Sequence, residues 1–255
     1  MMRILRIFCV ACALFLVWRV DSSFGLEHEL AGAFQRANVY YEQGKYDLAL
    51  QEYGAILARG VESGNLYYNI GNCYFKKGEV GRSLLNYEKA RRLIPLDKDL
   101  EANYEYARSL IKSAGSASGR SLSRKAIDGL SLGFSIDGLT IAVSAFFMLA
   151  LAGILAGLFF EAVRKRALIF AAAAALLCGA GFSGLSGKIA LIGKEAVVVT
   201  ERTDARFEPI EKATTYFTLY EGQKVQVLSS QESWYKVRRE DHKSGWVEKC
   251  FLEIF

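Results

Sequence analysis

Two long apolar runs constrain this chain more than any other feature of its sequence. Twenty-three consecutive uncharged residues lie between Asp137 and Glu161, and 21 lie between Arg166 and Lys188. A helix of about 20 apolar residues spans the hydrocarbon core of a bilayer, which is about 30 Å thick. We therefore predict two transmembrane helices, at residues 139–160 and 167–187, and we exclude a wholly soluble single domain.

The segment between the two runs, residues 161–166, is short and basic. Six residues are enough only to join two antiparallel helices, so both flanking regions lie on the same side of the membrane. Its three cations, Arg164, Lys165 and Arg166, favour placing this loop in the cytoplasm. We therefore predict an inner-membrane protein with both soluble regions in the periplasm.

The N-terminus supports the same topology. Two arginines precede an uncharged run at residues 7–18, and polar residues follow that run. This order is typical of a secretory signal peptide. Ser23 and Gly25 are the small residues that a cut after residue 25 requires, so we predict a signal peptide at residues 1–25, with an uncleaved anchor as the alternative.

The net charge of +5 is concentrated near the membrane. The leader and residues 113–194 carry the whole basic surplus, whereas residues 26–112 are neutral and residues 195–255 carry a net charge of −2. Domains that bind nucleic acids present basic surfaces. We therefore expect no nucleic-acid partner.

A repeat of 34 residues organises the region from 26 to 112. The recurring pairs are Asn38 and Asn72, Tyr40 and Tyr74, Gly44 and Gly78, and Tyr53 and Tyr87. In spacing and residue type the region resembles the tetratricopeptide repeat, with copies at 29–63 and 64–97. We expect two helices in each copy, a turn at each recurring glycine, and a capping helix at residues 99–112.

The tetratricopeptide resemblance implies a ligand groove lined by the first helix of each copy. Carried over position by position, the lining residues are Phe34, Asn38, Tyr41, Glu42, Tyr68, Asn72, Phe75 and Lys76. Asn38 and Asn72 are suited to bonding the backbone of an extended peptide. The alternative is that the tyrosines pack between copies and the asparagines are merely solvated. Because Phe34 and Tyr68 stand where a carboxylate-gripping groove has lysine or arginine, we do not expect capture of a peptide C-terminus.

Residues 113–138 are predicted to form a flexible linker, because serine and glycine crowd its first part. Beyond residue 195 the pattern changes to short β-like runs separated by turn residues. The predicted strands are Ala196–Thr200, Tyr216–Tyr220, Val225–Leu228, Trp234–Arg238, Gly245–Val247 and Leu252–Phe255. About 60 residues with five or six strands favour a small closed or partly open barrel.

A Trp-Tyr pair at 234–235 and a Gly-Trp-Val run at 245–247 make residues 195–255 similar to the bacterial SH3 domain. That resemblance implies binding of cell-wall peptide or of another protein, with Trp234, Tyr235 and Trp246 as the contact aromatics. The alternative is that Tyr235 and Trp246 belong to the barrel core. Phe207 and Glu208 replace the small residues usual in the loop after the first strand, which argues against a cell-wall ligand.

No catalytic or metal-binding pattern stands out in the sequence. The two histidines, His28 and His242, lie in different predicted domains, and no motif pairs a nucleophile with a base. Cys73 and Cys250 fall one in each soluble region, so neither region can close an internal disulfide or offer a zinc cluster. We therefore predict no enzymatic activity, no cofactor and no metal site.

The order of the segments is more specific than any one of them. A leader, helical repeats, a polar linker, a hairpin with a basic loop and a terminal SH3-like domain together resemble the BatE proteins of the bacterial aerotolerance (Bat) operons. The resemblance implies partner proteins with von Willebrand A domains and a MoxR-type ATPase system.

We therefore expect a multidomain fold with three parts: all-α tetratricopeptide-like helical repeats, a two-helix transmembrane hairpin, and a small all-β SH3-like barrel. The expected function is a non-enzymatic envelope scaffold that is anchored in membrane lipid and binds protein partners. A peptidoglycan-binding membrane anchor is the alternative.

Overall fold

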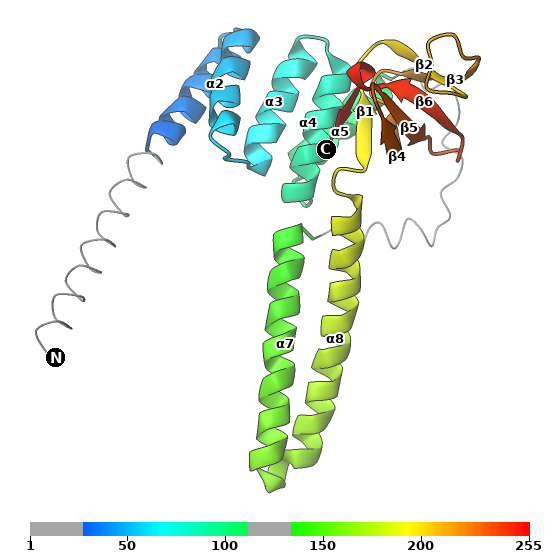
Figure 1. The fold of residues 1–255 in the computed structure, drawn as a ribbon. Coiled ribbons are helices and arrows are strands. Elements are labelled where there is room, and N and C mark those ends of the chain that lie inside the picture. Colours follow the sequence, from blue (N-terminus) through cyan, green and yellow to red (C-terminus); the bar gives the residue numbers. More distant parts are fainter. Residues whose placement is uncertain (1–27, 112–133) are drawn as a thin grey trace, which may run out of the picture. The chain divides into compact units, whose positions relative to one another are not determined.

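A computed structural model describes residues 28–111 and 134–255 of the chain. These residues, drawn as ribbons in Figure 1, divide between Glu62 and Ser63 into two compact units. The predicted signal peptide and all but the last five residues of the predicted linker lie outside the described residues. The predicted helical region, apolar hairpin and all-β C-terminal domain are each confirmed as structural classes.

The first unit is a helical pair made of residues 28–42 and α2 (Tyr46–Ala58). Its core is formed by small and aromatic side chains on the facing sides, among them Ala37, Ala49 and the fully buried Tyr53. An exposed ion pair between Arg36 and Glu52, 2.7 Å long, also joins the two helices. Burial of the apolar face, rather than this surface pair, stabilises the helical pair.

The second unit begins with three further helices. They are α3 (Gly64–Lys76), α4 (Val80–Leu93) and α5 (Lys98–Ser109). Ser63 and Asp97 cap α3 and α5 by accepting a backbone N–H of the first turn, which explains why the helices start there. The predicted capping helix at 99–112 is therefore present, but it begins one residue earlier and ends at Ser109.

The recurring glycines end the first helix of each copy in the same way. Gly44 and Gly78 have φ angles of +72° and +80°, which glycine adopts without strain. In both turns the glycine N–H and the next N–H bond back to carbonyls of the last helical turn. This double bond pattern satisfies carbonyls that the helix end leaves without partners. The 34-residue recurrence of glycine therefore reflects a backbone requirement.

The hairpin consists of α7 (Ile136–Phe159), a short 3-10 turn η1 (Glu161–Val163) and α8 (Arg164–Leu191). By length and composition both long helices can cross a membrane, with mean hydropathies of 2.4 and 2.0. Gly153 lets the helices approach closely, since a Cβ there would lie 3.0 Å from the Cβ of Ala171.

The predicted hairpin boundaries differ from the structure at both ends of both helices, although the first helix ends only one residue earlier than predicted, at Phe159. The first helix starts at Ile136 rather than 139, because Ser135 caps it by accepting the N–H of Gly138. The second helix starts at Arg164, so only residues 161–163 of the predicted loop at 161–166 connect the two helices. The three cations of that segment form the first turn of α8. This helix also continues to Leu191, past the predicted end at 187.

The C-terminal domain is one antiparallel sheet of seven strands. They are β1 (Glu195–Val198), β2 (Arg202–Arg206), β3 (Thr215–Tyr220), β4 (Lys224–Gln231), β5 (Trp234–Arg238), β6 (Ser244–Glu248) and β7 (Leu252–Ile254), with a 3-10 turn η2 (Lys249–Phe251) before the last. The strand order is β3-β2-β6-β5-β4-β1-β7. The sequence missed β2.

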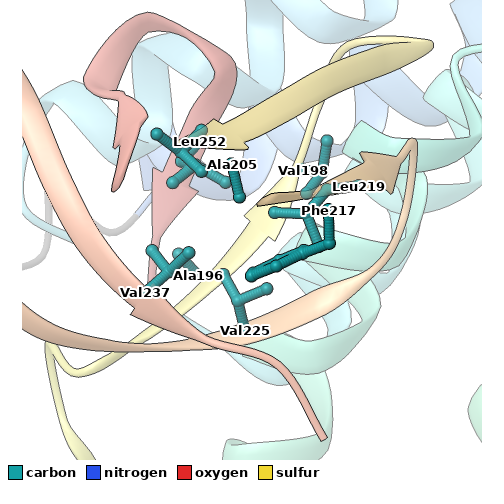
Figure 2. Close-up of a cluster of buried hydrophobic side chains, with 9 residues drawn as sticks. Ala196, Val198, Ala205, Phe217, Leu219, Val225, Val237 and Leu252 are labelled. Atoms are coloured by element: carbon teal, nitrogen blue, oxygen red, sulfur yellow. The ribbon is translucent and has the colours of Figure 1, made fainter. Parts of the chain in front are cut away.

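Side chains from both ends of the strand order meet in one core. Figure 2 shows Phe217 and Leu219 of β3 together with Ala196 and Val198 of β1. Leu252 of β7 belongs to the same cluster. A sheet whose opposite edges share a core must curl around it, which is the barrel-like arrangement that the sequence predicts.

Candidate ligand-binding surfaces

The predicted groove asparagines are first of all partners of buried tyrosines. Asn72 Oδ1 accepts a hydrogen bond of 2.6 Å from the hydroxyl of Tyr87, and Asn38 Oδ1 accepts one of 2.5 Å from Tyr53. Both tyrosines are almost fully buried, so each hydroxyl needs an acceptor. This Asn–Tyr hydrogen bond is not among the sequence-based predictions. The asparagine and the tyrosine both recur after 34 residues, and this shared recurrence indicates that they could act as a pair.

Helix α5 adds a wall to the predicted groove of the second unit. Asn103 of α5 donates from Nδ2 to the hydroxyl of Tyr68 (2.8 Å) and to Oδ1 of Asn72 (3.2 Å). Tyr106 of α5 is exposed and packs on Phe75, with ring centroids 5.6 Å apart. We call these five residues the α3–α5 surface. The predicted groove lacks Asn103 and Tyr106, because the tetratricopeptide resemblance lines it with the first helix of each copy alone.

The remaining predicted groove residues are divided between packing and solvent. Phe34 packs edge-on against Tyr53, and Tyr41 packs on Tyr46. Glu42 and Lys76 are exposed at the ends of their helices. Burial raises the pKa of Tyr68, so its hydroxyl stays protonated and available for hydrogen bonding. The ligand role of the eight groove residues stays a prediction.

We expect Asn72→Ala to destabilise the α3–α4 pair by about 1–3 kcal/mol, because the hydrogen bond that Asn72 accepts from the buried Tyr87 hydroxyl is lost. Hydrogen exchange of α3 and α4 in the full-length chain measures this change. The matched variant is Tyr87→Phe, which removes the donor instead. If the bond between the two side chains is the cause, the double variant is no less stable than Asn72→Ala alone; additive losses would contradict this explanation.

The aromatic residues predicted to contact a ligand on the C-terminal domain are largely packed. Trp234 is only 7% exposed, and Tyr235 packs against the core cluster. Trp246 is partly buried and faces Lys236, whose Nζ lies 5.8 Å from its ring centroid. The structure thus places these three rings mainly within the domain, and their ligand role stays a prediction.

The exposed aromatic residues of this domain lie at the loop between β2 and β3. Phe207 is 57% exposed and stacks on Tyr216, with ring centroids 4.5 Å apart. The guanidinium of Arg206 donates to the carbonyls of Glu211 and Ala213, which holds the loop in shape. Phe207, which the sequence marked as a departure from the SH3 pattern, is therefore a better contact candidate than Trp234.

A shallow hollow of about 280 Å³ lies beside this loop, on β2 and the end of β6. Its lining residues are Arg202, Thr203, Asp204, Arg206, Glu248 and Phe251. The mixture of both charge signs with one aromatic ring suits a short polar peptide segment. In the described parts of the chain, no three His, Cys, Asp or Glu side chains are placed to hold a metal ion.

Residues 202–253 match the family model of the bacterial SH3 domain. The C-terminal domain is a bacterial SH3 domain. The match starts at β2, while the structure adds β1 and the final residues to the same sheet and core. No curated protein matches the sequence of the chain.

The SH3 domain docks on one face of α4. Leu85 forms a buried cluster with Val197 and Phe255 of the SH3 domain. The N–H of Gly81 donates to Oε1 of Glu221 over 2.7 Å, so an SH3 carboxylate binds the N-terminal turn of α4. Positions 81, 85, 88 and 92 recur at helical spacing and form this docking face.

A buried carboxylate lies at the centre of the docking face. Glu88 accepts from the hydroxyl of Tyr104 over 2.8 Å and from Nζ of Lys224 over 3.4 Å. Lys224 also pairs with Glu195 (3.0 Å), which in turn pairs with Arg92 (2.7 Å). The charges alternate in sign from Glu88 through Lys224 and Glu195 to Arg92, so the buried carboxylate of Glu88 has a neighbour of opposite charge.

The pKa of Glu88 is lowered by this arrangement. Burial alone would raise it, but the charges of Lys224 and Arg91 and the hydrogen bond from Tyr104 outweigh burial. The carboxylate therefore stays ionised at neutral pH. In contrast, burial raises the pKa of Cys73 to about 12, which makes this thiol a small apolar side chain rather than a nucleophile.

Proposed function

We propose that this chain is a non-enzymatic scaffold, anchored in the bacterial inner membrane, that binds protein partners through its helical region and its SH3 domain. A bacterial SH3 domain suggests binding of protein or of peptidoglycan. The observation that carries the proposal is the attachment of this domain: only residues 192–194 separate it from α8, which is apolar and long enough to span a membrane. The same domain docks on α4, which adds helices α3, α4 and α5 to the anchored unit.

The binding surfaces of the scaffold are the α3–α5 surface and the loop between β2 and β3. Both combine exposed aromatic rings with polar side chains, which is the composition of protein recognition sites. The order of segments, similar to BatE proteins, supports a role in a Bat-type stress assembly. Its partners are then proteins with von Willebrand A domains and a MoxR-type ATPase system. Crosslinking in intact membranes, followed by mass spectrometry, identifies the partners directly.

For topology, we expect both soluble regions outside the cytoplasm. Cysteines introduced at exposed Gln51 and Ser230 should react with a membrane-impermeant thiol reagent in cells whose outer envelope has been opened. A cysteine at Lys165, in the first turn of α8 next to the hairpin turn, should react only after lysis. Protection of Gln51→Cys or Ser230→Cys before lysis would refute this orientation.

The scaffold and the peptidoglycan anchor predict different behaviour of the full-length chain in detergent. As a scaffold, it should not sediment with purified peptidoglycan, and Phe207→Ala should remove partner crosslinks that the wild type forms. The control is Phe160→Ala, at an exposed position of the hairpin. Sedimentation with peptidoglycan that Phe207→Ala abolishes would favour the anchor instead.

A further inference from the structure

The turn between α4 and α5 exposes an apolar tip that nothing in the described chain covers. Residues 93–96 are the consecutive apolar residues Leu, Ile, Pro and Leu. Leu96 is 76% exposed, more than any other large hydrophobic residue of the described helical region, and Leu93 is exposed as well. Single exposed leucines are common on protein surfaces, so the exposure of Leu96 alone does not indicate a binding site.

The docking contacts fix the direction in which α4 runs along the SH3 domain. Near the start of α4, a Cβ on Gly81 would lie 2.7 Å from the carbonyl oxygen of Val198. In the middle, Leu85 clusters with Val197. Near its end, Arg92 bonds Glu195. The helix therefore runs antiparallel to β1, and its C-terminal end points toward the start of β1.

The start of β1 is tied closely to the end of the membrane helix. Helix α8 ends at Leu191 and β1 starts at Glu195. Four residue steps span at most about 14 Å in an extended chain. Because α4 runs antiparallel to β1, its C-terminal end extends past Glu195, the first residue of β1. The chain enters β1 from α8 on this same side. The tip therefore lies near the membrane end of that helix.

The charges around the tip leave an apolar contact as its main attraction. Arg91 and Arg92 precede the tip, but they already pair with Glu101 and Glu195. Asp97, which follows the tip, caps α5. Arg91 and Arg92 are thus occupied within the protein, and the exposed Lys98 stands between Asp97 and Asp99 in the sequence. The leucines therefore remain to bind an apolar surface.

We propose that the α4–α5 turn is a membrane-contacting tip, with Leu96 and Leu93 inserted at the boundary between the headgroups and the acyl chains. Its occupant is the same bilayer that the hairpin spans, so the proposal rests on the proposed membrane anchoring. Amphipathic segments bind membranes at this depth by burying apolar side chains. The tip then gives the helical region a second, non-covalent contact with the membrane.

The test uses the full-length chain in phosphatidylcholine vesicles, with its native cysteines replaced and a nitroxide-sensitive fluorophore on Leu96→Cys. Lipids that carry a nitroxide near the headgroup should quench this label several-fold more than the same label on Lys76→Cys. Lys76 is exposed and precedes α4 at its opposite end, so it corrects for the affinity of the label itself.

Flotation of the vesicles and extraction with alkaline carbonate report anchoring separately. Equal, weak quenching at both sites in chains that float and resist extraction would overturn the membrane tip and leave the anchoring intact. Loss of the chain on extraction would overturn the anchoring and the tip together. Selective quenching at position 96 in resistant chains is the expected result.

Discussion

Replacing Glu88 with alanine should destabilise the second unit by about 3 kcal/mol or more, the cost typical of removing one member of a buried ion pair. The variant leaves the Tyr104 hydroxyl without the Glu88 acceptor and leaves Glu195 as the one remaining acidic partner of Lys224 among the described residues. Urea unfolding of the full-length chain gives the free energy, and hydrogen exchange should rise in both α4 and β1. The matched control is Glu52→Ala, which removes an exposed pair with Arg36 and should cost less than about 1 kcal/mol.

The pH dependence of docking follows from the same carboxylate. Because the pKa of Glu88 is lower in the folded state than its ordinary value of 4.5, its stabilising contribution is complete above that value. It is lost as the pH falls through the folded-state pKa. Docking should therefore be constant from neutral pH to about pH 5 and weaken only in stronger acid. Glu88→Gln should remove this acid transition; a transition that persists in the variant would assign it to another group.

Gly81→Ala should loosen the SH3 domain even though alanine is the better helix former. The new Cβ would lie 2.7 Å from both the Val198 carbonyl oxygen and the Cγ of Glu221. Overpacking of this kind costs about 1–3 kcal/mol, more than the gain in helix propensity of up to about 1 kcal/mol. Hydrogen exchange should increase in β1 and β7 while the interior of α3 stays protected.

The control for this prediction is Gly54→Ala in α2. A Cβ on Gly54 meets no heavy atom within 4 Å, so only the change in backbone entropy and helix propensity remains. We expect this variant to be more stable than the wild type by about 0.5–1 kcal/mol. Opposite signs for the two glycines would support docking at Gly81. Equal stabilisation of both would show that α4 and the SH3 domain do not hold each other in solution.

The elements that sequence predicts well are those with a local signal. The hairpin is visible because hydropathy is a property of each residue, and the turns at Gly44 and Gly78 are visible because a glycine recurs there at the repeat spacing. The strand β2 was missed because its sequence, Arg-Thr-Asp-Ala-Arg, has only two small inward residues, Thr203 and Ala205. Its pairing with β3 and β6, rather than its own composition, makes it a strand.

The candidate surfaces also divide into contacts with a local or repeated sequence signal and contacts between residues far apart in the sequence. The Asn–Tyr pairs lie 15 residues apart within each helical pair, and their repetition made them detectable in principle. The Glu88–Lys224 contact joins residues 136 positions apart, and neither residue differs in type or setting from a solvated surface charge. Trp234 is the opposite case: its residue type suggests a contact surface, its neighbours in the sheet leave it only 7% exposed, and its ligand role stays a prediction.

The α4 side and the SH3 side of the docking face lie far apart in the sequence, and this distance constrains the order in which the protein can fold. The docking face of α4 is complete only when the SH3 domain packs on it, and two apolar helices lie between them in the chain. Contacts between residues so distant in sequence form late, after local structure. Until the SH3 domain has folded and packed on α4, Leu85 and the charged Glu88 lie on an open surface. A chain stalled before that stage therefore exposes apolar and charged side chains that the folded second unit buries.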